Sequence, residues 1–135
     1  MDMDEAAAII RSDPFASSLG IEFVLIESGH AVSRMKLTGE HLNFMGLVHG
    51  GAIFALADAT FGAAANSNGT MAMAIHVSID FLAPPGGTEH LEADVREDAR
   101  AGRGGHYVMK ITNDSGELVA VCQGWAYHTA RPLVE

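Results

Sequence analysis

The stretch VHGGAIFALADATFGAAANSNG, residues 48–69, decides the fold of this chain. Alanine, the strongest helix former, is its commonest residue, and NSNG at 66–69 supplies residues that end a helix. The stretch is apolar around the whole circumference of such a helix, which predicts burial on nearly all sides. Its small side chains let neighbouring backbone approach closely. We therefore predict a central helix wrapped by a sheet.

One acid, Asp58, interrupts this apolar helix. An ionised carboxylate without a partner is costly in an apolar interior, so Asp58 must be paired, protonated or placed at a crevice. Two interpretations stay open. The acid can form a structural pair with an arginine or a backbone N–H across a subunit interface. Alternatively, it is a general base or nucleophile in a desolvated cleft.

The start of the same helix bears on this choice. Gly50 and Gly51 place unpaired backbone N–H groups at the positive end of the helix dipole, where an oxyanion can bind. Gly50 and Asp58 lie eight residues apart, which is roughly 12 Å along one helix. That is too far for both groups to touch one reacting carbonyl. The sequence therefore points to a site shared between two subunits.

Alternation of apolar and polar residues predicts strands in most of the remaining chain. The predicted strands cover residues 21–28, 30–37, 74–82, 91–98, 105–112 and 118–129. A short helix is predicted over 4–12, ending before Pro14, and residues 38–49 are predicted to form a loop. Together, these elements predict an α+β domain over residues 1–135, with an antiparallel sheet of about six strands around one long helix.

Two of these strands carry sharper predictions. In residues 74–82, apolar and polar residues alternate. We expect the apolar side chains to face the core and the polar ones, including His76, to face solvent. The apolar residues are Ile75, Val77, Ile79 and Phe81. The predicted strand 118–129 carries apolar residues at both odd and even positions, and thus on both of its faces. We expect it to be covered on both faces, either centrally in the sheet or at a subunit contact.

Composition narrows the class of protein. The net charge of −9 argues against nucleic-acid binding, and the single cysteine, Cys122, excludes an internal disulfide and a cysteine-based metal cluster. The chain starts with acids rather than a basic signal segment, and its apolar run is too short to span a bilayer. We expect a cytoplasmic protein that binds no nucleic acid, membrane or metal.

A small basic cluster stands out against this acidic background. Arg96, Arg100 and Arg103 are three of only eight basic residues, and they fall within eight positions. Acidic residues surround them in the sequence. From spacing alone, we interpret the arginines as charge screening for these acids.

A family resemblance follows from the decisive stretch and its flanks. HLNFMGLVHGGAIFALADATFGAAANSNG (41–69) resembles the signature of the PaaI-like group of hotdog-fold thioesterases, in which an Asn, a Gly and HGG precede a helix that carries LAD. The likeness continues through VSIDFLAPPGG (77–87), AGRGGHYVMKITNDSGELVA (101–120) and GWAY (124–127). It covers roughly residues 15–128.

The resemblance implies a single hotdog domain whose curved sheet wraps the long helix. It implies a homodimer joined edge to edge, further paired into a homotetramer, with an acyl-CoA thioester as substrate and no cofactor beyond that CoA. The active site would lie at the dimer interface. Gly50, or alternatively Gly51, would supply the oxyanion N–H, and Asp58 would be general base or nucleophile. Asn43 would orient water or substrate, and His49 would shape the loop.

Further positions follow from the same resemblance. Arg103 and Arg100 would lie near the CoA phosphates. Some relatives carry Ser or Thr where this chain has Ala74, so that water positioning would fall to Thr60, to Asn43 or to no residue. The acyl pocket would be lined by apolar side chains, namely Phe44, Met45, Phe54 and Phe61.

Two other functions remain open at this point. Hotdog domains also house hydratases and dehydratases, which use a histidine and an acid, and His49 lies near the helix start. A non-catalytic acyl-CoA-binding module would use the same cleft. Binding alone does not need a buried acid, so Asp58 argues for hydrolysis.

Overall fold

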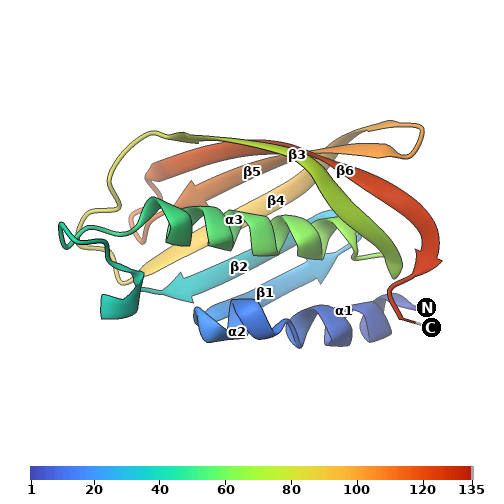
Figure 1. The fold of residues 1–135 in the computed structure, drawn as a ribbon, viewed down its shortest axis with the longest axis horizontal. Coiled ribbons are helices and arrows are strands. Elements are labelled where there is room, and N and C mark those ends of the chain that lie inside the picture. The colour runs from blue at the N-terminus through green and yellow to red at the C-terminus, as the bar shows by residue number, and fades with distance from the viewer. Residues whose placement is uncertain (135) are drawn as a thin grey trace.

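The computed structural model describes residues 1–134, and its central feature is a six-stranded antiparallel sheet curved around one long helix (Figure 1). The strand order in the sheet is β1-β2-β4-β5-β6-β3. The elements are α1 (Met3–Arg11), α2 (Pro14–Ser18), β1 (Ile21–Glu27), β2 (His30–Lys36), η1 (Gly39–His41), α3 (Gly50–Ala65), β3 (Thr70–Phe81), β4 (His90–Ala101), β5 (Gly104–Thr112) and β6 (Leu118–Pro132). The predicted α+β hotdog architecture is confirmed.

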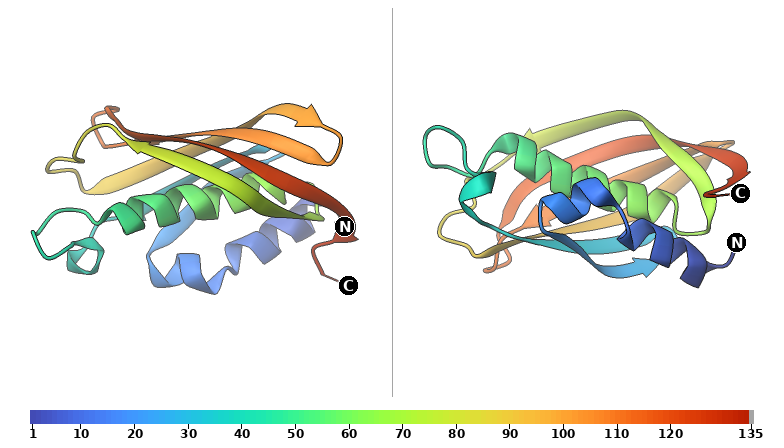
Figure 2. Two further views of the ribbon diagram at one scale, coloured as in Figure 1. Left: turned by 45° about the horizontal axis from the view of Figure 1, so that its top comes forward. Right: turned by 60° about the horizontal axis from the view of Figure 1, so that its bottom comes forward.

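Helices α1 and α2 lie on the same side of the sheet as α3 (Figure 2). The prediction for this region missed α2. Pro14 does end the first helix, but it also opens α2 as its first residue, because the Asp13 side chain caps α2 by accepting hydrogen bonds from Phe15 N and Ala16 N. Within residues 1–134, no helix is both long and apolar enough to cross a membrane.

The core lies between α3 and the concave face of the sheet. Small and large side chains of α3 alternate there: Leu56, Ala57 and Ala64 are buried, and Phe61 packs against Tyr107 with ring centroids 5.3 Å apart. Gly124 of β6 lies under Phe61, since a Cβ at this glycine would come within 2.8 Å of the Phe61 ring. The helix therefore sits against the sheet with no spare space at this point.

One face of α3 stays open, which corrects the prediction of burial on nearly all sides. Gly51, Asp58 and Gly62 are exposed. With Phe54 and Ala55, which are half-buried, they form a stripe along one face of the helix. We call these residues the open stripe. A single curved sheet covers only one side of a helix, and α1 and α2 cover only part of the other.

Strand β3, at one edge of the sheet, departs from the predicted alternation at two residues, Ile75 and Phe81; Phe81, at the end of the strand, is 54% exposed. Val77 and Ile79 pack against the core as expected, and His76 is exposed. Ile75 does not face inward and is 67% exposed, because the pairing of β3 with β6 shifts register between Ala74 and His76.

Strand β6 lies inside the sheet, between β5 and β3, which is one of the two positions expected for it. Its inner parity is buried, including Cys122 and Ala126. The opposite face of the strand is covered only in part, since Val119 is buried but Gln123 and Tyr127 are exposed. Within the single chain, β6 is therefore covered fully on one face only, and coverage by a subunit contact stays a prediction.

Replacing Gly124 tests the tight contact between α3 and the sheet. We expect Gly124→Ala to lower the free energy of unfolding by about 1–3 kcal/mol, because the new methyl group overlaps the Phe61 ring, the His76 carbonyl oxygen and Met109. Gly87→Ala is the matched control, since nothing lies within 4 Å of a Cβ at that position. Urea denaturation measures both variants. Equal stability of both would show that the helix is not closely packed here.

Candidate active site

The loop before α3 is built around Asn43. Its side-chain Oδ1 accepts hydrogen bonds from Met45 N at 2.9 Å and from Leu47 N at 3.1 Å, and its backbone N donates to Leu47 O at 2.7 Å. Asn43 is thus a turn residue. Its Nδ2 group has no acceptor among residues 1–134 and remains available to a ligand.

The first turn of α3 distinguishes the two candidate glycines. His49 is the N-cap, and its Nδ1 accepts a hydrogen bond from Gly51 N at 2.8 Å. That N–H is therefore occupied. Within the described chain, the Gly50 N–H has no acceptor, as expected for the first residue of a helix. Gly50 is the free donor, and the His49 ring is held as a cap rather than paired with an acid.

A cavity of about 730 Å³ opens at this amino end of α3. Asn43 and Gly50 both line it, and Phe81 of β3 lies against Gly50. Its remaining walls are apolar or small and come from the loops on either side: Leu37, Thr38, Gly39, Leu42, Gly46, Leu47, Val48, Ile53, Ala83, Pro84, Pro85, Gly86 and Thr88. None of these described residues carries a charge.

The predicted acyl-pocket residues do not come together in one chain. Phe44 and Met45 project into solvent from the loop tip, and neither lines the cavity. Phe61 is buried and faces the sheet. Phe54 lies on the open stripe of α3. The sequence pattern placed these residues near one another along the chain but did not fix the directions of their side chains.

Asp58 lies in the middle of the open stripe, between two hollows. One hollow, of about 460 Å³, separates it from α1 and α2, and the other, of about 160 Å³, separates it from β3. No side chain of residues 1–134 hydrogen-bonds or ion-pairs with its carboxylate. Desolvation by the surrounding walls raises the pKa of Asp58, and the nearby charge of Asp13 raises it further. Asp58 was expected to be paired, protonated or placed at a crevice, and the structure places it at a crevice.

The hydroxyl expected beside Asp58 is missing. Ala74 lines the smaller hollow, so the position that carries Ser or Thr in some relatives does face the acid. Thr60 does not replace it. Its side chain is fully buried, and its Oγ1 donates to Leu56 O at 2.7 Å. In the single chain, the Thr60 side chain therefore faces the core and not the hollow beside Asp58.

The two arginines assigned to CoA phosphates lie at the other end of the molecule, around the β4–β5 turn (Figure 1). Arg100 pairs with Glu97, and Arg103 Nη1 donates to His128 O at 3.2 Å. Within one chain they are not brought together with Gly50. Arg100 therefore has an acidic partner, as the charge-screening interpretation expects, whereas the partner of Arg103 is a backbone carbonyl.

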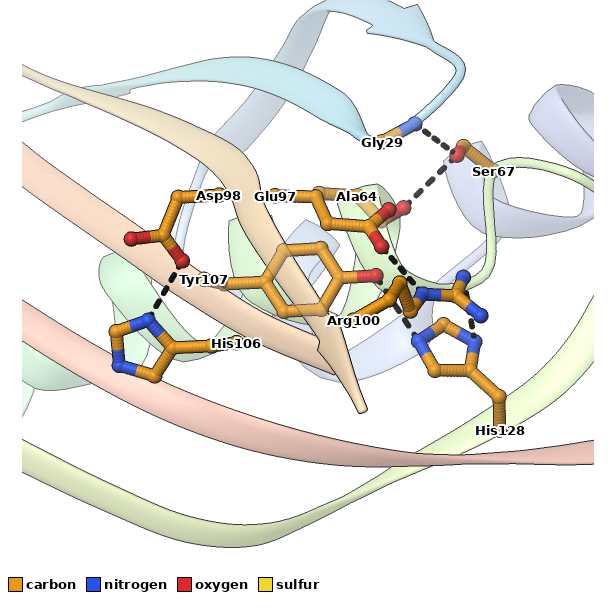
Figure 3. Close-up of polar contacts among 9 residues, drawn as sticks. All are labelled: Gly29, Ala64, Ser67, Glu97, Asp98, Arg100, His106, Tyr107 and His128. Carbon is orange, nitrogen blue, oxygen red and sulfur yellow. Dashed lines mark hydrogen bonds and ion pairs between the residues drawn. The ribbon is translucent and has the colours of Figure 1, made fainter. Parts of the chain in front are cut away.

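A polar cluster closes this end of the fold, and sequence reasoning missed it (Figure 3). The buried His128 Nε2 lies 3.0 Å from Tyr107 Oη, and its Nδ1 lies 3.4 Å from Arg100 Nη2. Burial raises the pKa of Tyr107 to about 12, and burial with the Arg100 charge lowers the pKa of His128. His128 lies at the same alternate positions of β6 as Gly124 and Ala126, which face inward. This spacing was the one signal in the sequence that His128 is buried.

No metal centre is evident: among residues 1–134, no group of three or more His, Cys, Asp and Glu side chains is arranged to hold an ion. Three groups on α3 and the loop before it remain available to a ligand: the Gly50 N–H, the Asn43 amide and the Asp58 carboxylate. A free backbone donor at a helix start can stabilise an oxyanion, and a desolvated carboxylate can act as base or nucleophile. Groups of these two kinds can carry out acyl transfer to water.

Comparison with known proteins agrees with this class. A family profile described as "Domain of unknown function (DUF4442)" matches residues 5–126. The acyl-coenzyme A thioesterase PaaI of Escherichia coli K12 is 35% identical over 119 residues, which are 88% of this chain and 85% of that protein. The structure of E. coli PaaI superposes with a TM-score of 0.87 at 33% identity, covering 96% of this chain and 94% of the other.

A second relative was solved with a bound ligand. The structure of smu.793 from Streptococcus mutans UA159, bound to acetyl CoA, superposes with a TM-score of 0.76 at 26% identity over 83% of this chain and 90% of that one. The fold and site define a hotdog-fold thioester hydrolase. The chain belongs to the DUF4442 family and, within the hotdog fold, to the PaaI-like thioesterases.

The unpartnered carboxylate of Asp58 has a consequence for stability. Because its pKa is raised in the folded state, folding disfavours the charged form, so this penalty grows as the pH rises above the ordinary aspartate range and is absent below about pH 4. We expect Asp58→Asn to be more stable than the wild type at pH 7.5, with the difference vanishing near pH 3.5. Urea denaturation at the two pH values measures it. A less stable Asn variant at pH 7.5 would reveal a partner for the carboxylate.

Proposed function

We propose that this protein hydrolyses acyl-CoA thioesters at a site formed by two copies of the chain. The observation that carries the proposal is the separation of two unsatisfied groups on one helix. The Gly50 N–H and the Asp58 carboxylate lie eight residues apart, roughly 12 Å along α3, and neither has a partner in the described chain. A second copy related by two-fold symmetry brings the acid of one chain beside the glycine of the other.

In the proposed reaction, Asp58 takes a proton from a water molecule as that water adds to the thioester carbonyl. Alternatively, the carboxylate itself attacks and forms an anhydride, which water then hydrolyses. In both cases the carbonyl oxygen becomes an oxyanion that accepts a hydrogen bond from Gly50 N–H. Collapse of the tetrahedral intermediate expels CoA thiolate, which takes up a proton. Because Ala74 offers no hydroxyl to position a water molecule beside Asp58, it favours direct attack by the carboxylate or a slower hydrolysis.

The uncharged cavity beside Gly50 supports a small aromatic or a short- to medium-chain acyl group as substrate. Asn43 Nδ2 would orient the substrate or the attacking water at the mouth of this cavity. The PaaI relative and the acetyl CoA bound by the streptococcal protein support CoA as the thiol. The protein would need no cofactor beyond this substrate. We also propose that the protein is cytoplasmic.

The edge strand β3 supports the proposed assembly. Met73 and Ile75 expose apolar side chains at this free edge, which is the kind of edge that a second copy can extend into a continuous sheet. We propose a homodimer joined here, with further pairing into a homotetramer through the uncovered outer face of β6.

Release of free CoA from a panel of aromatic and aliphatic acyl-CoA esters tests the proposal. We expect Asp58→Asn to slow release by a factor of about a hundred or more, because the side chain keeps its volume but loses its basicity. The wild-type rate should also fall as the pH is lowered through the raised pKa of Asp58. Asp4→Asn, at an exposed acid of α1, is the matched control.

Equal turnover by wild type and Asp58→Asn would refute the role of the acid while leaving the class of enzyme intact. If the wild type binds acyl-CoA esters but turns over no member of the panel, the protein is a binding module and the proposal fails.

The two roles of Asn43 can be separated by paired substitutions. Asn43→Asp keeps the oxygen that holds the turn but loses the amide donor, so we expect kcat/KM to fall roughly tenfold or more with little change in Tm. Asn43→Ala loses both and should lower kcat/KM and Tm together. Full activity of Asn43→Asp would show that this residue serves the turn alone.

A further inference from the structure

The tip of the loop before α3 is apolar and exposed. Phe44 is 96% exposed, Met45 61% and Leu47 54%. The tip is also well ordered by hydrogen bonds, because Asn43 Oδ1 accepts from two backbone N–H groups and Gly46 N donates to Asn43 O at 3.0 Å. A protruding apolar side chain held in a fixed position is typical of an interface anchor.

The same chain carries an apolar hollow with no occupant of its own. It is the hollow of about 460 Å³ between α3 and the α1–α2 pair. Most of its walls are apolar or small: Ile9, Ile10, Pro14, Phe15, Ala55, Ala59, Gly62, Ala63 and Leu133. Asp58 lies on its rim together with Asp13, Ser12 and Asn66. Phe15 is 63% exposed, so an aromatic partner can reach it.

Symmetry relates the loop tip to this hollow. In the proposed two-chain site, Gly50 lies opposite the partner's Asp58. The two-fold axis places Asp58 opposite the partner's Gly50 in the same way. Two such contacts require the α3 helices to run antiparallel, with Phe54, midway between the two residues, nearest the axis. The loop before α3 extends beyond the amino end of that helix (Figure 1). In the antiparallel pair it therefore points toward the part of the partner's α3 that follows Asp58, where Gly62 lines the hollow.

We propose that Phe44 of each chain inserts into the hollow between α1–α2 and α3 of a second copy. There it completes the wall of that copy's Asp58 site. This inference rests on the proposed function. Charge favours this occupant. Each chain carries a net charge of −9, so two copies repel, and the rim of the hollow bears two acids. Residues 42–48 carry no acid, which lets this segment approach without like-charge repulsion.

The insertion has a chemical role. Without it, Asp58 stands open to solvent on one flank of α3. An aromatic ring in the hollow excludes water from that flank and leaves the acid accessible only from the substrate side. Phe44 is thus a positioning residue, contributed by one chain to the acid of the other.

Photocrosslinking tests the contact directly. Phe44 is replaced by p-benzoyl-phenylalanine, and the chain is mixed with ¹⁵N-labelled copies so that mass spectrometry separates adducts between chains from those within a chain. We expect adducts between chains on peptides that contain residues 9–15 or 58–66. The control is the same probe at Val24, an exposed residue of β1, which should not label these peptides. Adducts between chains at other peptides, adducts within one chain only, or a dimer without adducts would overturn the inference.

The dimer affinity supplies a second readout. We expect Phe44→Ala to weaken self-association by about tenfold or more in sedimentation equilibrium, as for a buried aromatic anchor, while Val24→Ala leaves it unchanged. Phe44 is exposed in the single chain, so the substitution does not disturb folding. If Asp58→Asn is inactive but Phe44→Ala associates normally, only this inference fails. A wild type that hydrolyses acyl-CoA as a monomer would refute the two-chain site as well.

Discussion

The close contact between α3 and the sheet is the constraint on which the other features depend. Alanines on the inner face of α3 and Gly124 on β6 remove the space that larger side chains would need, so the helix has one axial rotation relative to the sheet. That rotation sends Phe61 inward and leaves Asp58 on the open stripe. It also aligns Gly50 with Asp58 along one rigid element, so their separation cannot be shortened by movement within the chain.

Much of this could be predicted because it is local. Alanine content and helix-ending residues defined α3, alternation defined the sheet, and the cost of an unpaired charge singled out Asp58. The side-chain direction of Thr60 was also within reach: two residues past Asp58 is about 200° around the helix at 3.6 residues per turn, which turns the hydroxyl away from the acid. Closeness to Asp58 in the sequence therefore does not place the Thr60 hydroxyl beside the acid in the single chain.

Other features depend on tertiary contacts that carry no local signal. The register shift at Ile75 arises from pairing between β3 and β6, and the start of α2 at Pro14 from a side-chain cap. The side chains that contact the arginines also could not be predicted from local sequence. Arg100 is held by Glu97 and faces His128, which comes from the far end of the chain. Only the fold brings these side chains into one cluster, where they satisfy buried polar groups.

The separation of Gly50 from Asp58 has a genetic meaning. On the proposed arrangement, every site takes its acid from one copy and its loop from the other. A copy that has lost the acid and a copy that has lost the loop are each inactive alone. Combined, they form a hybrid in which one site carries both defects and the other carries none. Two inactive alleles of this gene would then complement each other, which no single-chain site allows.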